Sequence, residues 1–248
     1  MKPSNPNFWT SIDGRLSLRN LEAEESVYRN NIFPAWKKNI IDEAIVIYYE
    51  IYDCHSGTYI DNSLYQKDDC YIKQGDIVLD LGANIGIFSR FASDKGAEKV
   101  YSFEPIQENF KLLALNMPDN CEAHKLAISN EDNKTVSIAY KPDCPGGSSM
   151  LKYDDGILQK CMTMTISTLI KNKLIQQPDF IKMDIEGAET LAFKGITDTV
   201  LKKTRCIAME MHNHVIGDEG IDYIYSRLTK LGFTSFTLYN PDNNNIVW

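Results

Sequence analysis

The sequence has no Cys-x-x-Cys pair among its six cysteines, which excludes the usual ligand spacing of a structural zinc site. It also has no uninterrupted apolar run near the ~20 residues that a membrane-spanning helix needs. The longest candidate, residues 40–52, contains three acidic side chains, and the first six residues lack the apolar stretch of a signal peptide. We therefore expect reduced thiols and a cytoplasmic protein without a membrane segment.

Positive charge is scarce as well. Lys and Arg total 26 against 34 Asp and Glu, so the formal net charge is −8. Binding to a nucleic-acid backbone relies on clustered cations, so this balance argues against a nucleic-acid partner. Hydrophobic residues make up 43% of the 248 residues, which is enough for one globular domain with an appendage.

The sequence pattern changes near residue 70, where regular alternation of strand-like and helix-like segments begins. We interpret residues 1–70 as an N-terminal cap or lid and residues 71–248 as the main domain. The Trp and Tyr side chains of the first segment suit a lid, a homodimer surface or ordinary core packing. The sequence leaves these three alternatives open.

From Gly75 onward, short apolar strands alternate with helical stretches, which predicts a doubly wound α/β fold with a mostly parallel sheet. Helices are expected to begin near Pro105, Glu186 and Asp218. The expected strands are residues 77–80, 99–103, 122–128, 180–184, 206–211, 233–239 and 246–248, with β-hairpin material at 134–165 and a loop at 142–149. Ligands of such sheets bind beyond the carboxyl ends of the strands, so the last residue of each strand is a candidate site residue.

A glycine turn, Asp80-Leu-Gly-Ala-Asn-Ile-Gly86, follows the first expected strand. It fails the GxGxxG pattern of dinucleotide sites, and a carboxylate at its mouth would repel a pyrophosphate but suit a cationic ligand. Glu104 ends the next strand, where an acidic side chain accepts ribose hydroxyls. A ribose acceptor without a phosphate-binding turn predicts S-adenosylmethionine as the ligand. In the alternative interpretation, Asp80 only caps a helix and Glu104 is a solvated strand end.

Adenine is expected to stack near Pro105 and Ile106, with polar contacts from the end of the third strand. The predicted cofactor-binding residues are Asp80, Gly82, Ala83, Asn84, Gly86, Glu104, Pro105, Ile106, Ile128, Ser129 and Asp184.

Three segments, Val78–Gly86, Val100–Pro105 and Phe180–Glu189, give the chain a resemblance to the FkbM-type methyltransferases, a branch of the class I S-adenosylmethionine-dependent enzymes. The resemblance covers about residues 71–248. It implies a seven-stranded sheet with a reversed final strand, and O-methylation of a hydroxyl on a sugar, glycan or secondary metabolite. The chain departs from the family at Thr165-Ile-Ser167, where the family has Thr-Leu-Asp. Ser caps a helix about as well as Asp, so we expect the fold to tolerate the change.

The ends of the fourth and fifth expected strands carry the candidate catalytic residues. Lys182 and Asp184 share one strand face, and Glu210 and His212 share a face of the next strand. His212 is the first candidate for the base that removes the acceptor proton, and Asp184 is the second. The alternatives are a Lys182–Glu210 ion pair that only orders the sheet and a His212 that is only hydrogen-bonded.

The acidic residues after the fourth strand allow two further interpretations. A divalent metal held by Asp184, Glu186, Glu210 and His212 is conceivable, but the spacing does not demand it, so no metal site is predicted. Glu189 is interpreted as a first-turn acid that complements the helix dipole.

The sequence therefore predicts an S-adenosylmethionine-dependent O-methyltransferase that works by in-line SN2 transfer to a small-molecule or carbohydrate acceptor. A non-catalytic nucleoside-binding module of the same fold is one alternative. A nicotinamide-dependent oxidoreductase is another, but the chain lacks both GxGxxG and a Tyr-x-x-x-Lys pair. No nucleic-acid or membrane partner is expected.

Overall fold

The computed structural model describes residues 69–141, 144–149, 156–234, 238–239 and 246–247. The predicted cap at residues 1–70 therefore lies outside the described residues, apart from its last two positions.

The main sheet contains five parallel strands, as the alternating sequence pattern predicts. In spatial order these are β3 (Cys121–His124), β2 (Lys99–Phe103), β1 (Ile77–Leu81), β8 (Phe180–Met183) and β9 (Cys206–Glu210). Next to β9 lies β11 (Ile246–Val247), which runs antiparallel, and β10 (Leu238–Tyr239) pairs with it at the edge. The prediction of an α/β fold with a mostly parallel sheet is confirmed.

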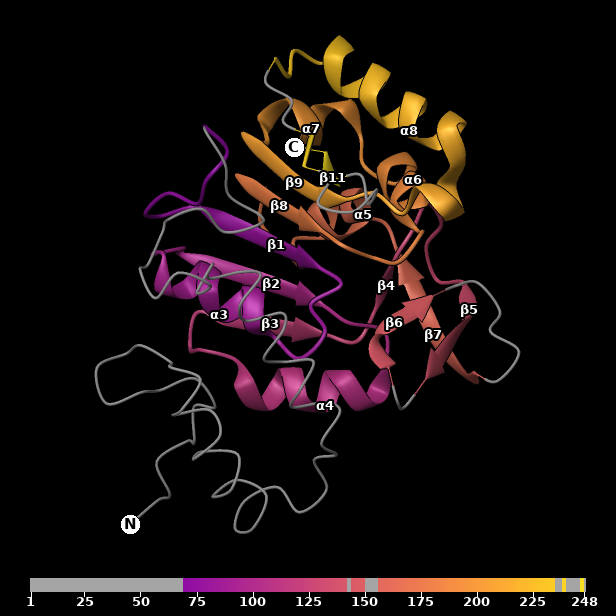
Figure 1. Cartoon of the computed structure of the whole chain (residues 1–248). Coiled ribbons are helices and arrows are strands. Elements are labelled where there is room, and N and C mark those ends of the chain that lie inside the picture. Colours follow the sequence, from indigo (N-terminus) through magenta and orange to yellow (C-terminus); the bar gives the residue numbers. More distant parts are fainter. Residues whose placement is uncertain (1–68, 142–143, 150–155, 235–237, 240–245, 248) are drawn as a thin grey trace.

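Helices cover both faces of this sheet (Figure 1). They are α3 (Ile87–Asp94), α4 (Gln107–Asn116), α5 (Ile166–Lys171), α6 (Glu189–Lys194), α7 (Asp198–Lys203) and α8 (Asn213–Lys230). Side chains alternate between the faces of a strand, so β1 sends Leu79 and Leu81 into a core with α5 to α8. The other face of the sheet meets α3, where Phe88 of α3 stacks on Phe180 of β8 with ring centroids 6.2 Å apart. None of the helices in the described ranges is long and apolar enough to cross a bilayer.

A second sheet lies on the side of the main sheet where the parallel strands end (Figure 1). Its strands are β4 (Ala127–Ile128), β7 (Ile157–Met164), β5 (Thr135–Lys141) and β6 (Cys144–Ser149). The prediction of one strand over residues 122–128 is wrong, because the chain leaves the main sheet after His124 and joins the second sheet at Ala127. Most of the predicted loop at 142–149 is also wrong, since residues 144–149 form β6.

Three local predictions need correction. Helix α6 begins at Glu189 and not at Glu186, because Glu186 has a φ of 52° and cannot continue a right-handed helix. Helix α8 begins at Asn213, five residues before the predicted start, and contains a non-helical Gly217. The cap of α5 is Thr165, whose hydroxyl accepts from the Thr168 N–H at 3.1 Å, so Ser167 is not the capping residue.

Gly82 is where the ends of β1 and β8 come closest together. Its φ is +77°, and a Cβ built on it would lie 1.7 Å from the Asp184 carbonyl oxygen. Backbone cannot move aside as a flexible side chain can, so only glycine fits here. The glycine is thus explained by packing between two strand ends, which sets the position of Asp184.

We expect Gly82→Ala to destabilise the protein by about 2–5 kcal/mol, because unfavourable φ adds to overlap with backbone. Gly75→Ala is the matched control, since Gly75 has a φ of +88° and a Cβ added there would meet nothing within 4 Å. It should cost only about 1–2 kcal/mol. Urea unfolding measures both, and equal costs would contradict the close approach of the two strands.

Candidate active site

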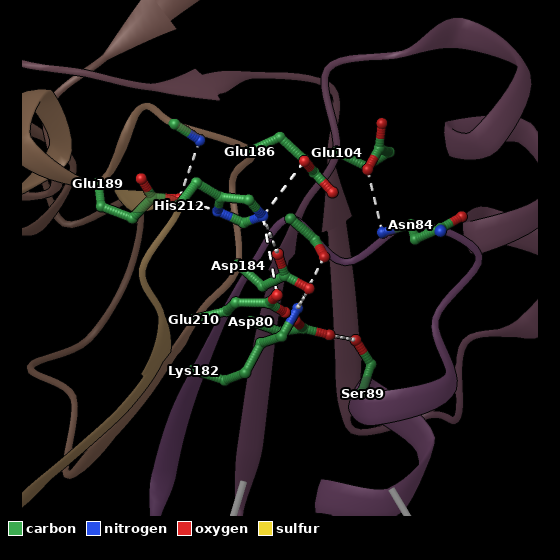
Figure 2. A network of polar contacts seen from close by, with 12 residues as sticks. Asp80, Asn84, Ser89, Glu104, Lys182, Asp184, Glu186, Glu189, Glu210 and His212 are labelled. Carbon is green, nitrogen blue, oxygen red and sulfur yellow. Dashed lines mark hydrogen bonds and ion pairs between the residues drawn. The ribbon is translucent and has the colours of Figure 1, made fainter. Parts of the chain in front are cut away.

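The polar residues of interest gather where β2, β1, β8 and β9 end side by side (Figure 2). Glu104 and Asn84 lie at one end of this row, and His212 lies at the other with Glu186, Glu189 and Glu210. Lys182, Asp80 and Asp184 lie between them. The structure thus brings the predicted ribose acceptor and the predicted catalytic residues to one edge of the sheet.

A buried ammonium joins the two central strands. Lys182 Nζ donates to the Gly82 carbonyl at 2.9 Å and lies 3.5 Å from Asp80 Oδ1 and 3.7 Å from Asp184 Oδ2. Burial alone would lower the pKa of Lys182, but the carboxylates of Asp80 and Asp184 raise it above its ordinary value, so the side chain stays charged. Glu210, which the sequence suggested as the partner, also raises the pKa of Lys182, but less than Asp80 and Asp184 do.

Asp80 lies inside the protein and not at the mouth of the glycine turn. Its side chain is fully buried, and its Oδ2 accepts from the Ser89 hydroxyl at 2.6 Å. The Ser89 oxygen in turn lies 2.7 Å from that of Ser102. Asp80 therefore acts on the site through Lys182 and the turn, and the structure gives no sign of the helix-capping alternative.

Glu104 is held by the backbone on both sides. Its Oε2 accepts from the Asn84 N–H at 3.0 Å, and its Oε1 accepts from the Ile106 N–H at 2.8 Å. The residue is 5% exposed, and burial raises the pKa of its carboxyl group to about 8, although these hydrogen bonds and Lys182 act in the opposite direction. The alternative of a solvated strand end is therefore wrong.

The rest of the glycine turn is shaped to face Glu104. Gly82 and Ala83 donate their N–H groups to the Phe103 carbonyl at 3.0 Å, and Asn84 has a left-handed φ of 49°. Gly86 precedes α3 with a φ of 96°, and a Cβ there would lie 2.9 Å from Leu113 Cδ1. The turn is thus fixed by its own packing before any ligand binds.

The predicted adenine contacts divide into two groups. Ile106, which follows Pro105, packs with Ile138, Tyr140 and Cys161 of the second sheet and forms an apolar wall beside Glu104. Ile128 is 5% exposed and packs in the main core, which explains it as a structural residue.

Ser129, which follows Ile128, is also buried. A Cβ on Gly195 would lie 2.1 Å from the Ser129 carbonyl oxygen, so Ser129 packs against the end of α6. The structure gives neither Ile128 nor Ser129 a contact with Glu104.

His212 lies at the junction of β9 and α8, and carboxylates surround it. Its Nδ1 is 2.9 Å from Glu189 Oε1, and its Nε2 is 3.2 Å from Glu186 Oε2. Glu210 Oε1 and Asp184 Oδ1 lie 3.9 and 4.0 Å from the same Nε2. Both ring nitrogens therefore have carboxylate partners.

The charges of this cluster act on one another. Burial would lower the pKa of His212, but hydrogen bonds to Glu186 and Glu189 and the charge of Asp184 raise it to about 11. The surrounding carboxylates thus favour the doubly protonated ring. Burial, with the charges of Asp184 and Glu186, raises the pKa of Glu210 to about 7.

Two residues of this cluster were not among the predicted site residues. Glu189 is fully buried and accepts from the Gly187 N–H at 3.0 Å as well as contacting His212. Glu186 reaches His212 because its left-handed backbone turns its side chain back toward β9. The acidic spacing Asp-x-Glu-Gly-x-Glu after a strand was the available signal, but a first-turn acid normally serves the helix dipole.

We expect Lys182→Met to destabilise the protein by about 3–5 kcal/mol, because it leaves Asp80 buried without a counter-charge. Protonation of Asp80 removes that cost, so the loss should be large at neutral pH and shrink in acid. The double variant Lys182→Met/Asp80→Asn should recover much of the stability, and the exposed Lys111→Met should change little. Denaturant unfolding at several pH values measures this, and a pH-independent loss would contradict the ion pair.

Comparisons with known proteins point to one family. The profile of the methyltransferase FkbM domain matches residues 80–235. The 31-O-demethyl-FK506 methyltransferase FkbM of Streptomyces tacrolimicus is 24% identical over 213 residues, which cover 70% of this chain and 81% of that protein. The hexuronic acid methyltransferase AglP of Haloferax volcanii is 24% identical over 143 residues, which cover 56% of this chain and 57% of that protein.

A solved structure shares the fold. The crystal structure of a methyltransferase FkbM from Methylobacillus flagellatus KT superposes with a TM-score of 0.50 at 19% identity. The match covers 92% of this chain and 58% of that chain.

Proposed function

The chain belongs to the FkbM methyltransferase family, and from this we propose that it transfers a methyl group from S-adenosylmethionine to a hydroxyl of a sugar, glycan or secondary metabolite. The observation that carries the proposal is the single edge of the sheet that has Glu104 at one end and the carboxylate–histidine cluster at the other. One end suits a nucleoside and the other suits a hydroxylated acceptor. Family membership also argues against the nicotinamide-dependent alternative.

The residues around Glu104 fit the cofactor. A carboxylate offers about four lone-pair positions, and two rigid backbone donors use only two of them. The buried Asn109 side chain donates a third hydrogen bond, and the remaining position can accept a ribose hydroxyl. The turn from Gly82 to Gly86 borders the same carboxyl group, since the Asn84 N–H donates to Glu104 Oε2.

When bound, the cofactor supplies an electrophilic methyl group on a positively charged sulfur. The chain's own task is to position an acceptor oxygen and to take its proton. Carboxylates accept hydrogen bonds but donate none, so Asp184, Glu186 and Glu210 suit an acceptor with several hydroxyls and disfavour a phosphate-rich one. This supports a small-molecule or carbohydrate acceptor and opposes nucleic acid.

Removal of the acceptor proton falls to a carboxylate and not to His212. Both nitrogens of His212 already face carboxylates, whereas Asp184 and Glu210 each have about a quarter of the side chain exposed. His212, held by Glu189, instead positions these groups. This proposal reverses the order of the sequence-based prediction, in which His212 came before Asp184.

Glu104→Gln should weaken binding of S-adenosylhomocysteine about 10–100-fold, measured by calorimetry, because the amide replaces one acceptor oxygen with an NH2 donor. It should also change the pH dependence of stability. The pKa of Glu104 rises from 4.5 to about 8 on folding, so wild-type stability falls as pH rises across that range. The variant lacks this loss, and its relative stability should therefore grow with pH. Unchanged cofactor affinity would refute the ribose assignment.

Methyl transfer itself is tested with a deuterated-methyl cofactor and a panel of sugars and polyhydroxylated metabolites, with products identified by mass. We expect an O-methylated product, and Glu210→Gln should lower its turnover about 100-fold or more while cofactor affinity stays nearly constant. Cofactor binding without transfer to any hydroxyl would favour the non-catalytic binding module. Stabilisation by NADH and not by S-adenosylhomocysteine would contradict the proposal as a whole.

A further inference from the structure

Three side chains at the acceptor end converge as metal ligands do. Asp184, Glu210 and His212 each offer one ligand atom, and these atoms all lie within 4.8 Å of one another. Asp184 follows β8, Glu210 ends β9 and His212 follows β9, so two adjacent parallel strands deliver all three. The ligand atoms are thus mounted on rigid elements of the main sheet.

The orientation of His212 is fixed from behind by a fully buried carboxylate. Glu189 Oε1 accepts from the Gly187 N–H at 3.0 Å and lies 2.9 Å from His212 Nδ1. This keeps a proton on Nδ1 and aims Nε2 at Asp184, Glu186 and Glu210. A carboxylate behind a histidine whose other nitrogen faces the ion is the usual outer arrangement of protein metal sites. The placement of Glu189 behind His212 therefore supports a metal site separately from the number of carboxylates in the cluster.

Within the part of the chain that the structure describes, carboxylates outnumber cations in this cluster. Four carboxylates lie within 4.0 Å of one imidazole, while the nearby Lys182 is shared between Asp80 and Asp184. Partly buried like charges are costly unless a cation lies among them. A divalent ion would compensate this excess.

We propose that Asp184, Glu210 and His212 bind a divalent cation of the kind that takes mixed oxygen and nitrogen ligands, with Mn²⁺ as the best match. Mn²⁺ accepts carboxylates and imidazole together, whereas Mg²⁺ prefers oxygen alone. Neighbouring ligands of an octahedral ion at ~2.1 Å lie about 3 Å apart, so the two carboxylate oxygens must each move toward Nε2 by about 1 Å. Their partial exposure leaves room for that movement.

His212 would bind the ion through Nε2 as a neutral ring. Nδ1 keeps its proton for Glu189, and the proton that Nε2 shares with Glu186 leaves to solvent. The role of the ion in orienting acceptor hydroxyls rests on the proposed function, but binding of the ion does not.

The test measures Mn²⁺ binding to the full chain after a chelator has removed bound metal. Electron paramagnetic resonance reports the concentration of the free ion. We expect one saturable site per chain, weakened at least 10-fold by Asp184→Asn and by Glu210→Gln. The matched control is Glu219→Gln on α8, an exposed carboxylate outside the cluster, which should bind Mn²⁺ as the wild type does. Competition by Mg²⁺ and Zn²⁺ ranks the cations at the same site.

Absence of a saturable site would overturn the inference, as would equal weakening by all three substitutions, which would indicate general surface acidity. Thermal unfolding checks that the variants are folded. Because the two ligand variants lie at the ends of different strands, the test still works if one of them fails to fold. S-adenosylhomocysteine affinity is measured in parallel without metal. Cofactor binding without Mn²⁺ binding refutes only the metal site, whereas Mn²⁺ binding without cofactor binding refutes only the proposed function.

Discussion

The arrangement of the whole edge depends on one buried ammonium, that of Lys182. It binds the Gly82 carbonyl and lies between the carboxylates of Asp80 and Asp184, so it ties the end of β1 to the end of β8. Gly82 allows this because no side chain separates it from the Asp184 carbonyl. The glycine turn that presents Asn84 to Glu104 starts at this tie, and so does the segment that carries Glu186 and Glu189 toward His212. Without Lys182, the fully buried Asp80 would have no counter-charge, which is costly for the folded state.

The two ends of the edge use carboxylates in different ways. Glu104 accepts from backbone N–H groups that the fold cannot remove, so its position is set before a ligand arrives. At the other end, Asp184, Glu186 and Glu210 point at a histidine and keep exposed oxygen atoms. The first arrangement suits recognition of a fixed ribose, and the second suits a group whose charge changes during reaction. The division follows from backbone geometry: the segments after β1 and β2 supply the N–H donors of Asn84 and Ile106, and β8 is followed by a left-handed turn at Glu186.

The strand ends were predictable from the sequence because parallel strands place their last residues along one edge. Asp80, Glu104, Asp184 and Glu210 were all found in this way. The partner of Lys182 was not, because strand-face alternation cannot tell which neighbouring strand supplies the closer acid. The register pairs Lys182 directly with Asp80 across β1 and β8, and this decides it. Residues 122–128 look like one continuous strand, and only tertiary pairing reveals that they divide between two sheets. Glu189 was missed because a buried acid and a helix-dipole acid look the same in sequence.

Asp184 connects the two ends of the edge energetically. Its Oδ2 faces Lys182 and its Oδ1 faces His212, so one carboxylate serves the tie between strands and the acceptor cluster at once. A cation that draws this carboxylate toward Nε2 also withdraws it from Lys182, which then relies more on Asp80 and on the Gly82 carbonyl. Those two contacts hold the turn that faces the cofactor. A cation bound as proposed would thus change the free energy of cofactor binding, and by thermodynamic linkage the cofactor would change that of the cation by the same amount. This coupling requires no movement of the sheet, only a shift of one side chain between two partners that it already has.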